Sequence, residues 1–158
     1  MNDFVPPSGF ARHDHGFCIR AAMEAVEARV AEHKLRMTPV RRRVLEMLLE
    51  SHRAMGAYDV LARLKEEELG YQAPIAYRAL DFLVRHGFAH RVEKLNAYVA
   101  CARPDCVDPA FLICRSCAAV SESEVPGGLV GVGRAEGFAV ETAVLEAEGL
   151  CPRCRETA

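Results

Sequence analysis

Residues 74–87 read Pro74-Ile75-Ala76-Tyr77-Arg78-Ala79-Leu80-Asp81-Phe82-Leu83-Val84-Arg85-His86-Gly87, and this stretch decides the fold of the N-terminal part of the chain. Its apolar residues recur at the spacing of one buried helix face. Proline near the start and glycine at the end are typical helix boundaries. Two short β-like runs follow at once, Phe88–Val92 and Ala97–Ala100, joined by a polar turn. A helix followed directly by a hairpin predicts the recognition helix and wing of a winged helix-turn-helix domain.

Three more helices are expected upstream of this stretch. The first runs from about Ile19 to His33, and the next begins after the N-cap and proline pair Thr38-Pro39. The third runs from about Tyr58 to Glu68 and ends at Gly70. Residues 1–17 contain prolines and glycines, and we expect them to form a flexible tail.

Composition limits the class of protein. The chain has 158 residues, of which 51% are hydrophobic and 27% charged, so it is expected to be globular. No apolar run approaches the length of a membrane span, and we expect a cytoplasmic protein with no membrane partner. The net charge of −2 argues against a general nucleic-acid binder, but basic residues concentrate between Arg29 and Arg43, which suits a phosphate backbone.

Two Cys-x-x-Cys pairs mark the second half of the chain. Four thiols in two such pairs are the ligand set of a closed tetrahedral zinc site, and a reducing compartment favours metal ligation over disulfides. The four predicted structural zinc ligands are Cys114, Cys117, Cys151 and Cys154. Strands are expected at Phe111–Ile113, Ala118–Val120 and Phe138–Leu145. Val125–Glu136 is a weaker helix candidate because it is rich in glycine.

The predicted architecture is therefore of the α+β class. Residues 1–17 form a histidine-containing tail, residues 18–100 a winged-helix DNA-binding domain, and residues 101–158 a small α/β dimerisation and metal-binding domain clamped by the four-cysteine zinc site. Three cysteines are left over: Cys18, Cys101 and Cys106.

These motifs together resemble the ferric uptake regulator superfamily over roughly residues 18–154. The resemblance rests on Leu35-Arg36-Met37-Thr38-Pro39-Val40-Arg41, Ala57-Tyr58-Asp59, Ala76-Tyr77-Arg78-Ala79-Leu80-Asp81-Phe82-Leu83, Gly87-Phe88-Ala89-His90, Ala97-Tyr98-Val99-Ala100-Cys101, Phe111-Leu112-Ile113-Cys114 and Gly149-Leu150-Cys151-Pro152-Arg153-Cys154. Within the superfamily the chain is most similar to the zinc uptake regulator branch, because no histidine precedes the first cysteine pair and Cys101 closes the wing.

The resemblance implies a regulatory zinc site at the junction of the two domains. Its ligands correspond to His90, Cys101 and Glu122, with Glu124 as a rival for the carboxylate. The family's fourth ligand is a histidine that this chain lacks, and Cys106 is the nearest replacement, with Asp108 as the alternative. One imidazole, two thiolates and one carboxylate suit zinc better than ferrous iron or manganese.

The remaining candidates are a possible extra metal site at His13, His15 and Cys18, and a set of DNA contacts. Tyr58 and Arg78 match family positions that approach bases, where arginine can pair with guanine and tyrosine can contact a thymine methyl group. Tyr77 and Arg41 are the candidates for phosphate contacts, although Tyr77 could instead anchor its helix.

The expected function is zinc-sensing transcriptional repression. The resemblance implies a homodimer with two Zn2+ per protomer, one structural and one regulatory, that binds pseudo-palindromic operator DNA and represses zinc-uptake genes. A sensor of iron, manganese or nickel, or a thiol redox regulator using Cys101 and Cys106, remains open. We expect no enzymatic activity and no small-molecule substrate, since the His-x-Glu signature of zinc deaminases is absent.

Overall fold

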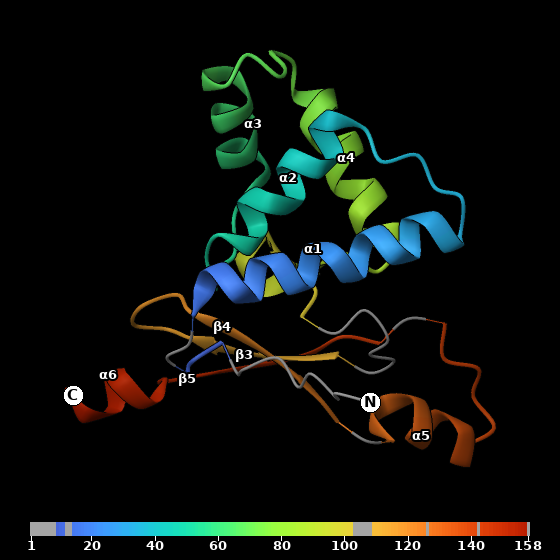
Figure 1. The fold of residues 1–158 in the computed structure, drawn as a ribbon. Coiled ribbons are helices and arrows are strands. Elements are labelled where there is room, and N and C mark those ends of the chain that lie inside the picture. Colours follow the sequence, from blue (N-terminus) through green and yellow to red (C-terminus); the bar gives the residue numbers. More distant parts are fainter. Residues whose placement is uncertain (1–8, 12–13, 103–108, 126, 142, 158) are drawn as a thin grey trace.

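The computed structural model describes residues 9–11, 14–102, 109–125, 127–141 and 143–157 (Figure 1). The elements in chain order are α1 (His15–Glu32), α2 (Pro39–Leu49), α3 (Ala57–Glu66), α4 (Ala73–Arg85), β1 (Ala89–Val92), the 3-10 turn η1 (Glu93–Leu95), β2 (Ala97–Ala100), β3 (Pro109–Cys114), β4 (Val120–Glu124), α5 (Gly128–Ala135), β5 (Leu145–Gly149) and α6 (Pro152–Glu156). The predicted α+β class is confirmed.

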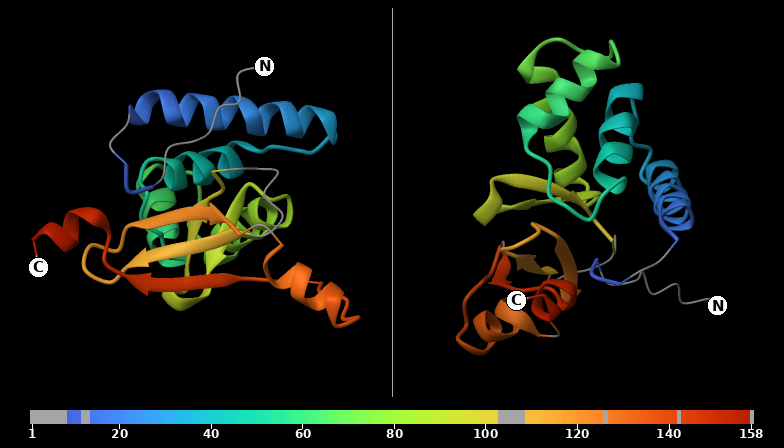
Figure 2. Two further views of the ribbon diagram at one scale, coloured as in Figure 1. Left: turned by 90° about the horizontal axis from the view of Figure 1, so that it is seen from below. Right: turned by 90° about the vertical axis from the view of Figure 1, so that its left-hand side faces the viewer.

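Helices α2, α3 and α4 form a compact group with α1 lying along one side, as Figures 1 and 2 show. The Thr38 side chain accepts a hydrogen bond from the backbone N–H of Arg41 at 3.3 Å, which caps α2 as the sequence predicts. The hydrophobic core beneath these helices is continuous and mainly aliphatic, and its fully buried members include Leu45, Leu48, Leu64, Leu80 and Leu83. Strands β1 and β2 pair as an antiparallel hairpin, so the predicted winged helix is confirmed.

The wing lies between the helices and a second sheet (Figure 2, right). Val92 and Val99 of the wing share one buried cluster with Phe111, Ile113 and Val120 of that sheet. The wing and the second sheet are therefore joined by a hydrophobic core of their own.

The second sheet has the strand order β4-β3-β5. Strand β3 is antiparallel to β4 and parallel to β5. The backbone N–H of Val120 on β4 donates to the carbonyl of His52 at 2.8 Å, and an isolated bridge joins Arg53 to Ala119. The loop between α2 and α3 is thus also tied to this sheet.

Two of the predicted strands lie later in the chain than expected. The strand expected at 138–145 is wrong for most of its length, because Gly137 (φ 71°) and the 2.7 Å bond from the Phe138 N–H to the Gly133 carbonyl turn the chain at the end of α5. The strand expected at 118–120 begins only at Val120. Ala118 has a left-handed backbone (φ 58°) in the tight turn that carries the first cysteine pair.

The N-terminal region also departs from the predicted boundaries. Helix α1 begins at His15 because the Asp14 carboxylate accepts a hydrogen bond from the Phe17 N–H at 3.2 Å, so the last residues of the expected tail are helical. Further upstream, the Gly9 N–H donates to the Ser121 hydroxyl at 3.2 Å, and Phe10 packs against the cluster around the cysteines. A Cβ at Gly9 would lie 2.3 Å from the Val120 carbonyl oxygen, so this close approach requires glycine.

Candidate metal centres

The two cysteine pairs meet in one cluster. Cys114 ends β3 and Cys151 follows β5, and the parallel register of these strands, which places Cys114 opposite Gly149, brings both pairs to the same edge. One sulfur atom from each of the four lies within 4.8 Å of the others; the four are Cys114, Cys117, Cys151 and Cys154. The group fits a closed four-coordinate zinc site.

The electrostatics differ between two of the four thiols. At Cys154, a bond from Ser116 is outweighed by hydrogen bonds with the neighbouring thiols and by burial, which raise the pKa to about 11, whereas at Cys114 the thiolate is favoured. The backbone N–H of Cys151 donates to the Cys114 sulfur at 3.3 Å. This bond, with further N–H donors from the first pair's turn, lowers the pKa of the Cys114 thiol to about 6. Cys114 therefore has the ionisation state that a zinc ligand requires at neutral pH.

A second group lies at the junction of the wing and the sheet. His90 comes from β1, Cys101 follows β2, and Glu122 comes from β4. One ligand atom from each of the three lies within 4.8 Å of the others. The structure thus brings together three residues that belong to two different parts of the fold.

One ligand atom of this second group, Nε2 of His90, is buried without a hydrogen bond. The Glu122 side chain is only 4% exposed, and its Oε1 atom lies 3.4 Å from Nε2 of His90. A buried imidazole nitrogen without a partner, next to a thiol and a carboxylate, fits a cation held between them.

The backbone orients the carboxylate. The N–H of Ala102 donates to Glu122 Oε2 at 2.7 Å, which leaves Oε1 facing Cys101 at 3.6 Å. Glu124, the rival carboxylate, is exposed and is not part of the group. Cys106 and Asp108, the candidates for a fourth ligand, lie outside the described residues.

The possible extra site near the N-terminus is only partly covered by the described residues. His13 lies outside them, and the His15 ring stacks on the His52 ring with centroids 4.7 Å apart. Burial raises the pKa of the Cys18 thiol, which disfavours the thiolate. In the described part of the chain, only the two groups above have three or more metal-ligand atoms close together.

The side chains predicted to approach DNA bases are exposed. Tyr58, at the start of α3, is 75% exposed, and Arg78 on α4 also faces solvent. Tyr77 is 41% exposed, which is compatible both with a phosphate contact and with a partly buried anchor of its helix. The base and phosphate contacts themselves remain predictions.

Part of the basic stretch is neutralised within the protein. Arg43 forms ion pairs with Glu46, Glu50 and Glu67, and Arg42 pairs with Glu27. These pairs were not foreseen from the sequence, and they reduce the charge that the stretch can offer to a phosphate backbone.

Arg41 has contacts within the protein as well. Its guanidinium carbon lies 3.8 Å from the centre of the Phe82 ring, and its Nη1 donates to the Arg36 carbonyl. The side chain therefore links the start of α2 to α4, and a phosphate contact by Arg41 remains a prediction.

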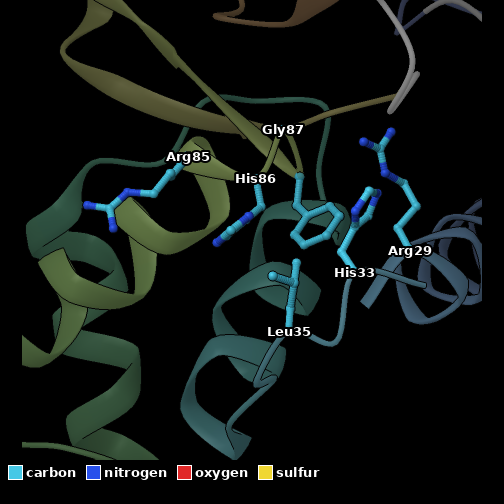
Figure 3. A pocket seen from close by; sticks show the side chains of 7 residues that line it. Arg29, His33, Leu35, Arg85, His86 and Gly87 are labelled. Carbon is cyan, nitrogen blue, oxygen red and sulfur yellow. The ribbon is translucent and has the colours of Figure 1, made fainter. Parts of the chain in front are cut away.

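A basic pocket of about 350 Å³ lies between the ends of α1 and α4 (Figure 3). Its lining includes Arg29, His33, Arg85 and His86. Burial and the neighbouring positive charges of Arg85, Arg41 and His33 lower the pKa of His86. The imidazole of His86 is therefore neutral over more of the physiological pH range than an ordinary histidine.

An apolar surface extends over α5 and the residues that follow it. Val132 is 61% and Phe138 68% exposed, and Leu129 is also exposed. Leu129 and Val132 lie three residues apart on α5, on one face of the helix, which makes this face a candidate interaction surface. Among the described residues, no helix is long and apolar enough to cross a bilayer.

The junction where β1 and the end of β2 meet β4 is the hinge of the molecule. A winged helix, a four-cysteine cluster and a three-ligand group at this hinge define a DNA-binding protein of the metal-responsive class. A family model described as the ferric uptake regulator family matches residues 32–142, and the chain belongs to that family. The zinc uptake regulation protein of Escherichia coli K12 is 40% identical over 131 residues, which are 80% of this chain and 77% of that protein.

Solved structures agree with this assignment. A zinc uptake regulator complexed with zinc and DNA matches at a TM-score of 0.80 and 37% identity, covering 88% of this chain and 96% of that one. The holo form of XcZur matches at a TM-score of 0.76 with 34% identity, covering 90% and 99%. Its apo form, at the same identity, matches only at 0.51, covering 87% and 97%. The arrangement of the parts in this chain is therefore closer to the holo form.

Two contributors to the junction were missed by sequence reasoning. The Ala102 N–H is a backbone group, so no residue pattern points to it. Glu146 on β5 contacts the wing across 53 residues of chain and looks in sequence like an ordinary polar residue of a strand. Only the folded arrangement reveals either contact.

Proposed function

We propose that this protein is a zinc-sensing transcriptional repressor that binds operator DNA as a homodimer in the cytoplasm and represses genes for zinc uptake. The observation that carries the proposal is the position of His90, Cys101 and Glu122, which come from both sides of the hinge between wing and sheet. The similarity to zinc uptake regulators and to a complex with zinc and DNA supports the choice of metal and of partner.

The four cysteines at the edge of the second sheet are proposed to hold a structural zinc, and the hinge group a regulatory one. Zinc, when bound, supplies a cation that imidazole, thiolate and carboxylate donors can share. His90 then holds β1 of the wing close to Glu122 on β4, and the Ala102 N–H keeps that carboxylate directed at the hinge. The residues of the chain thereby restrict how the winged helix sits on the sheet.

Restricting the winged helix matters because a dimer reads two half-sites at a fixed separation. The apolar surface of α5 is proposed to pair with a second copy, which places two recognition helices on one face. Zinc shifts the protein towards the arrangement that binds operator DNA because it binds this arrangement more tightly than the others. By linkage, operator DNA should tighten zinc binding by the same factor that zinc tightens DNA binding.

The proposal is tested with purified protein and an operator obtained by in vitro selection from random duplex DNA. We expect two zinc per protomer, one of which a mild chelator removes with loss of DNA binding. Replacing Cys101 with Ala should leave a folded dimer that no longer responds to zinc. Replacing Cys114 with Ala should impair folding itself, because a structural zinc contributes directly to folding.

Other metals are separate arms of the same experiment. Iron, manganese and nickel should restore DNA binding less well than zinc, because thiolate donors favour zinc over the harder cations. A redox sensor would lose DNA binding on mild peroxide treatment while its zinc content stays constant. If one of these metals restores DNA binding better than zinc, or if peroxide abolishes DNA binding at constant zinc content, the corresponding alternative replaces the zinc-sensing proposal.

A further inference from the structure

The tip of the wing is held by a carboxylate from the other part of the fold. Glu146 accepts hydrogen bonds from the backbone N–H groups of Glu93, at 2.6 Å, and Lys94, at 2.9 Å. These two residues open the turn η1, where N–H groups have no acceptor within the turn itself. A carboxylate at the N-terminal end of a helical turn also has favourable electrostatics.

The position of Glu146 is fixed by the sheet. Glu146 lies on β5 opposite Phe111, in the parallel pairing of β5 with β3. Two positions further along the same strand, Glu148 pairs with the Lys94 ammonium at 3.3 Å. Of the two carboxylates, only Glu146 contacts the wing backbone through bonds that the structure records.

The contact lies at the opposite end of the wing from the metal-ligand group. Strand β1 carries His90 near its start and ends at Val92, and Glu93 follows directly. Three residues of extended chain span about 10 Å. The wing is therefore attached to the sheet at two separated points, with the buried Val92 between them.

We propose that Glu146 is a positioning residue for DNA binding, which fixes the orientation of the wing on the sheet together with the hinge metal site. Without Glu146, the wing is held to the sheet by the hinge ligands and by the apolar contacts of Val92 and Val99, which are not directional. Directional hydrogen bonds at the tip add a second point that limits rotation of the wing about the hinge. This inference rests on the proposed function for its effect on DNA, but the contact itself can be tested without DNA.

The DNA test compares Glu146→Ala with Glu148→Ala. The two residues lie on the same strand, so the second variant is a matched control for loss of charge near Lys94. At saturating zinc we expect the first variant to bind the selected operator about tenfold more weakly and the second to bind like the wild type. Both should retain two zinc per protomer, since no ligand is changed. Equal DNA affinity of Glu146→Ala and the wild type would overturn the proposal.

The zinc titration separates positioning from a general loss of structure. Glu146 is expected to favour the arrangement in which the hinge ligands meet. Its removal should therefore also lower the affinity for the zinc that a mild chelator removes, because a smaller fraction of the protein is competent to bind it. The four-cysteine zinc should resist chelation as before. Glu146→Gln keeps one acceptor for one of the two N–H groups. Its affinities for operator DNA and for the removable zinc should lie between those of the wild type and of Glu146→Ala.

Hydrogen exchange tests the contact independently of DNA and of zinc sensing. The amides of Glu93 and Lys94 should exchange about tenfold faster in Glu146→Ala than in the wild type, and at the wild-type rate in Glu148→Ala. If the wild type binds DNA without regard to zinc, the proposed function fails while this measurement still decides the contact. Unchanged exchange in Glu146→Ala would show that Glu146 does not hold the wing tip.

Discussion

Replacing Glu122 with Gln should separate the metal chemistry of the hinge from its stability. The side chain is 4% exposed and accepts the Ala102 N–H at 2.7 Å. Glutamine has nearly the same shape and can keep that bond through its amide oxygen. Because the substitution also removes a buried charge, we expect the metal-free variant to match the wild-type free energy of unfolding within about 1 kcal/mol.

The zinc-dependent part of the stability should behave differently. Loss of a residue that only supports a ligand typically weakens metal binding about 10–100-fold, so loss of a ligand charge should weaken it by about 100-fold or more. For the wild type at a zinc concentration of 100 Kd, binding adds about 2.7 kcal/mol to the free energy of unfolding. With a 100-fold weaker site, the same concentration adds only about 0.4 kcal/mol.

The assay is denaturant unfolding of wild type and variant at a fixed free zinc concentration, with the four-cysteine site already filled. Glu124→Gln is the matched control, since Glu124 lies two residues further along β4 and is exposed. It should keep the wild-type response to zinc. If Glu122→Gln keeps the full zinc increment, or if Glu124→Gln loses it, the assignment of the hinge carboxylate is wrong.

Three further predictions concern other parts of the chain. Gly9→Ala should release the N-terminal segment, because the new Cβ would meet the Val120 carbonyl oxygen at 2.3 Å. A chelator should then remove the four-cysteine zinc faster than it does from the wild type. Gly16→Ala, whose Cβ would have ordinary contacts, is the control and should behave like the wild type. Arg43→Met should destabilise the protein by about 1–2 kcal/mol at pH 7. Hydrogen bonds from Arg43 and Arg63 outweigh burial and lower the pKa of Glu50, so the folded state releases this proton more readily than the unfolded one. The difference between wild type and variant in urea unfolding should therefore shrink as the pH falls below the ordinary pKa of about 4.5. Val132→Asp should place a charge in the apolar surface of α5 and yield monomers at concentrations where sedimentation shows the wild type as a dimer.

The elements that the sequence predicts correctly are those formed by residues close together in the chain. The helices and the wing depend on periodicity, caps and turn residues that lie close together in the chain, and Thr38 caps α2 as its position suggests. The hinge carboxylate was reached through resemblance to a family, and the structure places it beside His90 and Cys101. Neither spacing nor composition alone would have separated Glu122 from Glu124.

Features that depend on distant parts of the chain were not predictable in the same way. The position of β5 follows from its parallel pairing with β3 and from the turn that ends α5, not from a run of apolar residues. The docking of Gly9 depends on the close approach of two backbones. The bond from Glu146 to the wing tip joins residues 53 positions apart, and no local pattern distinguishes it from the neighbouring Glu148.

The balance between the two arrangements of the hinge is set by more than its metal ligands. Moving a two-state equilibrium from 1:99 to 99:1 requires about 5.5 kcal/mol of differential binding, whereas zinc at 100 Kd supplies about 2.7 kcal/mol. If zinc at that concentration is to populate the DNA-binding arrangement fully, the metal-free protein has to lie within a few kcal/mol of it. We expect the buried contact of Val92 and Val99 with Phe111, together with the bonds from Glu146, to contribute that bias before zinc is added. In the proposed mechanism the hinge ligands then need to add only the remaining free energy, so we expect a site with these three donors to be sufficient to fix the position of the winged helix.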